Sequence, residues 1–191
     1  MPELAGLTVA WDGEIDDFDP TRLPKLLWED GAHVLGVRFD ALRADGSLAL
    51  DVRLHHLPLR LYEHSQFTSG ITYQERVLGD PLGPHAGAGY LSLEWRPAPL
   101  ALLALGGALE RRDPSLYESR TDADGGHFRL VRVESRPVER RARLELSGRR
   151  DALRGVGASV RVGVDRVTNE DFAVRAARWR PFAEAGVQLR R

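Results

Sequence analysis

Alternation of apolar and polar residues with a period of two dominates this chain. In residues 47–55 the apolar positions are Leu48, Leu50, Val52 and Leu54, and the residues between them are polar or small. Because successive side chains of a β-strand point to opposite faces, such a segment has one apolar and one polar surface. No segment shows helical spacing as clearly, so the chain is predicted to be mostly β. The same alternation recurs over residues 142–147, 156–165 and 183–190.

Short turn signals separate these runs. Asp45-Gly46 lies between residues 32–42 and 47–54 and is a strong hairpin signal. The run over residues 127–134 changes phase between Leu130 and Val131, which predicts a β-bulge there. We expect about nine or ten antiparallel strands joined in sequence order. Further links are expected at residues 149–154 and 168–171, and one brief helix at residues 24–28.

The length of the runs favours a membrane barrel. Many are about 9–12 residues long, whereas ordinary strands average about 5–6 residues and tilted membrane strands need about 9–11. The polar faces carry many charged residues, as a water-filled lumen tolerates. Tyr90, Trp95, Trp179 and Phe182 border the apolar faces and are predicted to form aromatic girdles. A soluble up-and-down barrel with its apolar side inward alternates identically, so both alternatives stay open.

Composition removes several classes of protein. The 191 residues have a formal net charge of −1, so a strongly basic nucleic-acid binder is not the expectation. The chain contains no cysteine, which excludes disulfides, thiolate zinc sites and cysteine nucleophiles. It has no apolar run of about 18 residues for a membrane helix and no secretory signal. The length is ample for a sizeable core, and we expect residues 1–191 to form one domain.

Two segments carry candidate binding residues. The acidic run that contains Glu14, Asp16 and Asp17 offers ligands for a cation or for sugar hydroxyls. Its spacing does not match a calcium-binding loop, so a solvated loop or a helix cap is the alternative. A second segment combines aromatic and polar side chains suited to stacking on sugar rings, with girdle or lumen packing as the alternative. Its members are Tyr62, Glu63, His64, Phe67 and Tyr73.

Other residues give weaker signals. His55 and His56 are neighbours in a strand and should point to opposite faces, which argues against a shared metal ion. The arginines between residues 140 and 154 predict either a basic lumen that attracts acidic polysaccharide or a solvated polar face. The chain has no nucleophile elbow, P-loop or dinucleotide fingerprint, and no catalytic residue, metal or cofactor is predicted. A glycosidase pair of carboxylates stays an open alternative.

The segment from Leu61 to Leu93, with residues 13–39 before it, resembles capsule assembly proteins of the Wzi type. The similarity rests on an acidic Gly-Glu segment, an aromatic stretch with a histidine, a "Gly-x-Thr-Tyr" strand and a glycine loop, and it covers about residues 11 to 112. The matching residues are Gly13, Glu14, Asp16, Asp17, Tyr62, His64, Phe67, Gly70, Thr72, Tyr73, Gly79 and Gly83.

The resemblance implies an antiparallel outer-membrane β-barrel that holds capsular or another surface polysaccharide at the cell surface without catalysis. Its partners would be that polysaccharide and outer-membrane lipid, not nucleic acid. The polysaccharide would contact Tyr62, His64, Phe67 and Tyr73, with the acidic run nearby. Members of the family are longer, so we expect the chain to be the C-terminal part of a barrel. A porin-like channel and a soluble β-barrel that acts on glycans are the alternatives.

Overall fold

The computed structural model describes residues 6–15, 31–58, 72–73, 76–77, 82–83, 85–121, 128–151 and 156–189. These residues form twelve β-strands and one short 3-10 helix, and the strands hold more than half of the chain. The prediction of a mostly β chain is confirmed. The elements are β1 (Leu7–Ile15), β2 (Gly31–Phe39), β3 (Leu48–Leu57), β4 (Thr72–Tyr73), β5 (Arg76–Val77), β6 (Ala86–Ala98), β7 (Ala101–Arg112), β8 (Leu116–Thr121), β9 (Phe128–Glu134), β10 (Glu139–Asp151), β11 (Val156–Thr168), η3 (Glu170–Phe172) and β12 (Arg178–Leu189).

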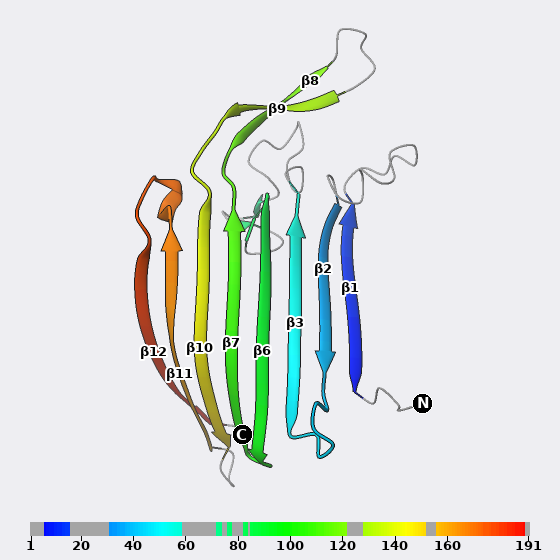
Figure 1. The fold of residues 1–191 in the computed structure, drawn as a ribbon, viewed down its shortest axis with the longest axis vertical. Helices are drawn as coiled ribbons and strands as arrows, with labels where there is room; N and C mark the ends of the chain where they lie inside the picture. The colour runs from blue at the N-terminus through cyan, green and yellow to red at the C-terminus, as the bar shows by residue number, and fades with distance from the viewer. Residues whose placement is uncertain are drawn as a thin grey trace.

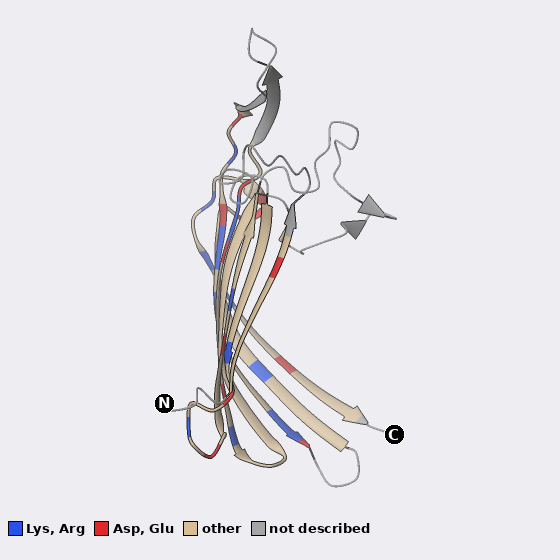
Figure 2. Cartoon of the chain, turned by 90° about the vertical axis from the view of Figure 1, so that its right-hand side faces the viewer, with Lys and Arg blue, Asp and Glu red and all other residues tan. Residues whose placement is uncertain are grey.

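Eight long strands form one antiparallel sheet in the order β1-β2-β3-β6-β7-β10-β11-β12 (Figure 1). The ribbons β4–β5 and β8–β9 lie in the connections between long strands that are neighbours in the sheet. This confirms the predicted up-and-down antiparallel architecture. Among the described residues, β1 and β12 each pair with one strand, so the sheet is open rather than closed into a barrel. Figure 2 shows that the sheet is curved, with β12 sweeping away from the earlier strands towards the C-terminus.

The local turn chemistry decides the first hairpin. β2 and β3 are joined through Asp45-Gly46, as predicted, and Gly46 has a φ of 67°. Glycine accepts this left-handed conformation without steric cost. The amide of Leu42 donates to the Leu48 carbonyl over 2.9 Å and closes the turn. The predicted helix at residues 24–28 lies outside the described residues.

The predicted bulge position is wrong. Leu130 and Val131 pair in regular register with consecutive residues of β8. The irregularity lies further along, because Leu116 pairs with Glu134 whereas Tyr117 pairs with Arg132. Tertiary pairing, which the local phase of the sequence does not report, decides where the extra residue is placed.

The register places apolar and polar residues on opposite faces across the whole sheet. Val9 begins one hydrogen-bonded row that passes through Val37, Val52, Leu91, Gly107 and Leu144 to Val164. The neighbouring positions make the other face, which carries charged residues such as Arg161 and Asp165. The alternation predicted for residues 156–165 is therefore found in β11. We call the two surfaces the apolar face and the polar face.

The apolar face is more exposed than the polar face, the reverse of a water-soluble sheet. Leu109, Trp179 and Val187 are 68%, 65% and 74% exposed. On the polar face, by contrast, the side chains of Asp51 and Asp165 are only 17% and 14% exposed. Seventeen large apolar residues of this sheet are exposed, and all of them lie on the apolar face: Leu7, Val9, Trp11, Leu35, Leu54, Leu91, Trp95, Leu103, Leu105, Leu109, Leu144, Leu146, Val156, Val160, Val162, Trp179 and Val187.

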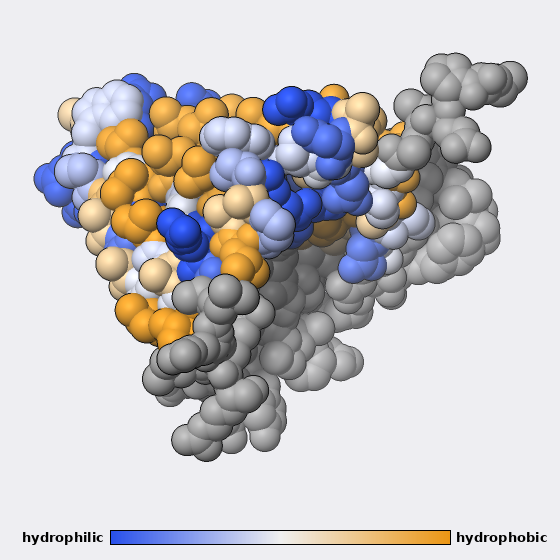
Figure 3. Space-filling view, turned by 90° about the horizontal axis from the view of Figure 1, so that it is seen from below, coloured by the Kyte–Doolittle hydropathy of each residue, from blue (hydrophilic) through white to orange (hydrophobic). Residues whose placement is uncertain are grey.

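The expected sizeable core is not found in the described residues. The buried apolar cluster consists of Ala32, Leu57, Leu82 and Ala86, at the end of the sheet where β2 and β6 begin. Val167 is the largest described side chain that is almost fully buried. In the space-filling view from below, hydrophobic residues gather over one side of the described sheet (Figure 3). The apolar residues are thus arranged as a surface layer rather than an interior.

Two of the four residues predicted to border the apolar face lie on that face. Trp95 and Trp179 lie on the apolar face towards opposite ends of the sheet, and Trp11 shares the row of Trp179. Tyr90 and Phe182 lie on the polar face, so their assignment to a girdle is wrong. Strand parity explains the difference, since Tyr90 alternates in step with the polar residues Ser92 and Glu94 of the same strand.

Candidate functional site

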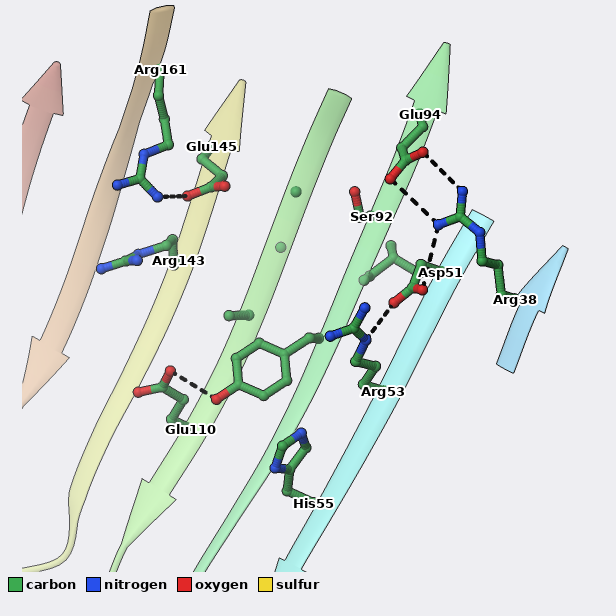
Figure 4. A pocket seen from close by; sticks show the side chains of 15 residues that line it. Arg38, Asp51, Arg53, His55, Ser92, Glu94, Glu110, Arg143, Glu145 and Arg161 are labelled. Atoms are coloured by element: carbon green, nitrogen blue, oxygen red, sulfur yellow. Dashed lines mark hydrogen bonds and ion pairs between the residues drawn. The ribbon is translucent and has the colours of Figure 1, made fainter. Parts of the chain in front are cut away.

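A hollow of about 510 Å³ opens on the polar face over the middle of the sheet (Figure 4). Residues of β3, β6, β7 and β10 line it, with one further residue from β2 and one from β11. Its principal polar side chains are Arg38, Asp51, Arg53, His55, Tyr90, Ser92, Glu94, Glu110, Arg143, Glu145 and Arg161.

One wall of the hollow is an ion-pair network on β2, β3 and β6. The Arg38 guanidinium donates to Glu94 over 3.0 Å and lies 3.6 Å from Asp51. Arg53 donates to the other oxygen of Asp51 over 2.9 Å. These three strands are neighbours in the sheet, so side chains of the same parity meet across them. The network fixes two arginines and two carboxylates at one side of the hollow.

The opposite wall is a second network on β10, β11 and β12. Arg143 makes two hydrogen bonds to Asp165, of 2.7 and 2.9 Å, which is the geometry of a bidentate pair. Arg161 donates to Glu184 over 2.7 Å and lies 3.8 Å from Glu145. The Phe182 ring contacts both arginines, with distances from its centroid to the guanidinium carbons of 5.2 Å for Arg143 and 5.7 Å for Arg161. This explains why an aromatic residue lies on the polar face.

Small residues form the floor between the two networks. Ser92, Gly106 and Ala108 leave room that longer side chains would fill. The Tyr90 hydroxyl lies at one end of this floor and donates to Glu110 over 3.3 Å. His55 packs edge-on against the Tyr90 ring, with centroids 5.2 Å apart. The floor therefore offers one aromatic ring, surrounded by groups that donate and accept hydrogen bonds.

The hollow is close to electrically neutral. Four arginines and four carboxylates line it. The hypothesis of a basic lumen is therefore not supported by the described residues. Of the arginines that prompted it, Arg143 and Arg149 are paired with Asp165 and Asp151 on the polar face, whereas Arg140 and Arg150 lie on the apolar face. Residue 154 lies outside the described part.

Most binding residues proposed from the sequence cannot be placed. Tyr62, His64, Phe67, Asp16 and Asp17 lie outside the described residues. The two other candidates are described by their backbone alone. Glu14 belongs to β1 and pairs with Ala32, so at this position the acidic run is strand rather than loop. Tyr73 is in β4 and pairs with Arg76.

The hollow itself was missed, although its residues carry a signal in the sequence. Each of its principal polar side chains belongs to a residue in step with the polar face of its own strand. His55 follows this pattern and lines the hollow, while His56 lies on the other face and stacks on His33, so the prediction of opposite faces is confirmed. Strand order and register are what bring Arg38 and Glu94 together across 56 residues of sequence.

The described residues were also compared with two other kinds of feature, a metal site and a membrane-spanning helix, and hold neither. In the described part of the chain, no three or more side chains of metal-ligating type gather as a group. No described helix is both long and apolar enough to cross a bilayer. Comparisons with family models, curated proteins and solved structures found no match to this chain. The resemblance to the Wzi type stays a prediction.

Proposed function

We propose that this chain forms the wall of an outer-membrane β-barrel and that the barrel holds polysaccharide. The apolar face would contact lipid, and the polar face would line a water-filled lumen. The observation that carries the proposal is the inverted exposure of the two faces. Seventeen large apolar side chains lie exposed on one face, while charged side chains are paired and partly shielded on the other. A bilayer supplies the apolar surroundings that these residues need.

The height of the apolar layer supports the proposal that a bilayer surrounds the apolar face. On β11 the apolar positions run from Val156 to Val164, and Val160 is their centre. Eight residue steps span about 27 Å along a strand, close to the apolar band of about 25 Å in membrane barrels. Arg140 and Arg150 lie on the apolar face near the two ends of β10. Long arginine side chains at such positions reach the polar head groups.

The layer also runs obliquely to the strands, as it does in a barrel wall. Val9 is the middle one of the three exposed apolar residues of β1, which are Leu7, Val9 and Trp11. Its row of paired residues nevertheless reaches β11 at Val164, the upper end of that strand's apolar stretch. The centre of the apolar layer therefore moves by four residues, about 13 Å along the strands, across six strand spacings that together measure about 29 Å. This corresponds to a strand tilt of about 25°, compared with about 35–45° in membrane barrels.

The chemistry of the hollow supports polysaccharide as the occupant. Tyr90 provides a ring for stacking, and the arginine and carboxylate networks provide donors and acceptors for hydroxyl groups. A nearly neutral site suits a polymer rich in hydroxyl groups. The aromatic segment that contains Tyr62, His64 and Tyr73 would add contacts, as the resemblance to capsule assembly proteins implies. Repeated weak contacts along one polymer combine through multivalency, so no bond need be broken.

A porin-like channel is the second candidate. The small floor residues Ser92, Gly106 and Ala108 favour it, because they leave a hollow on the lumen side. A conductance measurement in planar bilayers separates the two functions. Steady single-channel current that added polysaccharide does not block would favour the channel.

Polysaccharide retention is tested in cells that make capsule but lack a retention protein. Cells carrying the full gene are separated into cell-bound and released polymer. Tyr90→Ala is expected to lower the bound fraction, with Tyr62→Ala and His64→Ala adding to the loss. Tyr90→Phe keeps the ring and loses the hydroxyl group with its hydrogen bond to Glu110, so it is the matched control. An unchanged bound fraction in the alanine variants, with normal amounts of protein in the outer membrane, would refute the proposal.

A further inference from the structure

Three arginines lie together at one end of the apolar face. Arg111 on β7 is directly opposite Arg140 on β10. Arg140 in turn pairs with Thr168 on β11, which places Arg166, two residues earlier, diagonally beside it. All three belong to the upper end of the sheet in Figure 1, where β11 ends. We call them the arginine cluster.

The pairing within the arginine cluster is electrostatically unfavourable by itself. Like charges directly opposite on neighbouring strands destabilise a sheet. Arg111 is partly neutralised by the Asp113 carboxylate at 3.0 Å, and Arg166 lies over the Trp179 ring at 5.9 Å. Neither Arg140 nor Arg166 has an ion pair with any described residue. Counted over the described residues, the cluster thus keeps an excess of positive charge, which an anion would neutralise.

The space beside the cluster joins it to the apolar layer. A shallow hollow of about 470 Å³ is bordered by Arg111, Arg140 and Arg166 and continues over Leu109 and Ala142. Arg141 and one carboxylate residue, Glu110, also line it, so arginines outnumber carboxylates by four to one. Gly87, the partner of Arg111 on β6, contributes no side chain. The next three rows below this hollow contain only apolar residues and glycines, beginning with the row of Leu144 and Val164. An occupant should therefore be anionic at one end and apolar at the other.

We infer that the arginine cluster binds the phosphate-bearing head group of an anionic membrane lipid. The acyl chains of the lipid would lie along the apolar face below Leu109. The inference rests on the proposed function, because it requires the apolar face to lie in a bilayer. Arginine suits phosphate through its planar, forked donors, and basic residues near a membrane surface attract anionic lipid. Trp179 completes the site as an amphipathic ring at the interface.

The test uses the full chain with its other three tryptophans replaced by phenylalanine, reconstituted in vesicles. Fluorescence of Trp179 is quenched by brominated phosphatidic acid or, separately, by brominated phosphatidylcholine. The wild type is expected to prefer phosphatidic acid. Arg140→Gln should reduce that preference about fivefold, the effect of one charge near a membrane surface. Arg150→Gln, which removes an arginine at the other end of the same face, should leave it unchanged.

Each result decides a different question. Absence of quenching by brominated phosphatidylcholine would show that Trp179 does not meet lipid, and the proposed function itself would fail. Equal quenching by the two brominated lipids would overturn the lipid site but would not contradict the proposed barrel. An equal effect of Arg140→Gln and Arg150→Gln would also overturn it, as would loss of the preference when inorganic phosphate is added to the aqueous phase.

Discussion

Replacing Val160 by arginine tests which face of the sheet meets lipid. Val160 is 52% exposed and lies opposite Gly148 and Ala185 on its two neighbouring strands. It is four residues from each end of the apolar stretch of β11, about 13 Å along the strand. If the apolar face lies in a bilayer, Val160 is close to the midplane.

The expected cost follows from that depth. Arginine on the lipid face costs about 2–4 kcal/mol at the midplane and about 0–1 kcal/mol near the interfaces. Val160→Arg should therefore raise the unfolding constant by about 30- to 700-fold, whereas Val156→Arg at the end of the stretch should have a small effect. Ser159→Arg points to the polar face and lies opposite Arg149, so its cost should be about 1 kcal/mol or less.

The assay is equilibrium unfolding by denaturant of the full chain in phospholipid vesicles. The free energies of unfolding are expected to rank Val160→Arg as much less stable than both Val156→Arg and Ser159→Arg. A water-exposed surface tolerates such changes within about 0.5 kcal/mol. Equal stability of all three variants would refute a lipid-facing apolar face. A large cost that did not depend on depth would instead indicate a protein layer over this face.

Three further predictions concern the polar face and one end of the sheet. Asp165→Asn leaves Arg143 without its bidentate partner and should cost about 1–2 kcal/mol, whereas Glu184→Gln, in a more exposed pair, should cost less than 1 kcal/mol in the same unfolding assay. Gly163→Ala should cost about 1–3 kcal/mol, because its added Cβ would lie 2.6 Å from a carbonyl oxygen of β10 and 2.6 Å from a phenyl ring; wild-type stability would disprove this close packing. Burial holds the pKa of His85 below its ordinary value of 6.5, so stability should fall as the pH drops below about 6.5, because the unfolded chain takes up a proton that the folded site resists. His85→Asn, which also tolerates the φ of 51° at this position, should remove that dependence, and an unchanged pH profile in this variant would contradict the assignment.

The sequence by itself predicted the strands and their two faces. Side-chain direction in a strand depends on parity alone, so the apolar positions of β3 and β11 could be read locally. The turn at Asp45-Gly46 was equally local, since it depends on one glycine that accepts a positive φ. The same parity would have excluded Tyr90 and Phe182 from the apolar border. Aromatic character alone does not determine the face on which a strand residue lies.

The tertiary structure decided which face is shielded and which residues meet. The sequences of a soluble barrel and of a membrane barrel both alternate with a period of two. Only the curved sheet reveals that the apolar face is the more exposed one. The hollow joins residues from six strands, and the pair of Arg38 and Glu94 depends on the register of β2, β3 and β6. The arginine cluster likewise exists only because β7, β10 and β11 are neighbours. Register is a property of paired strands, and one strand's sequence does not contain it.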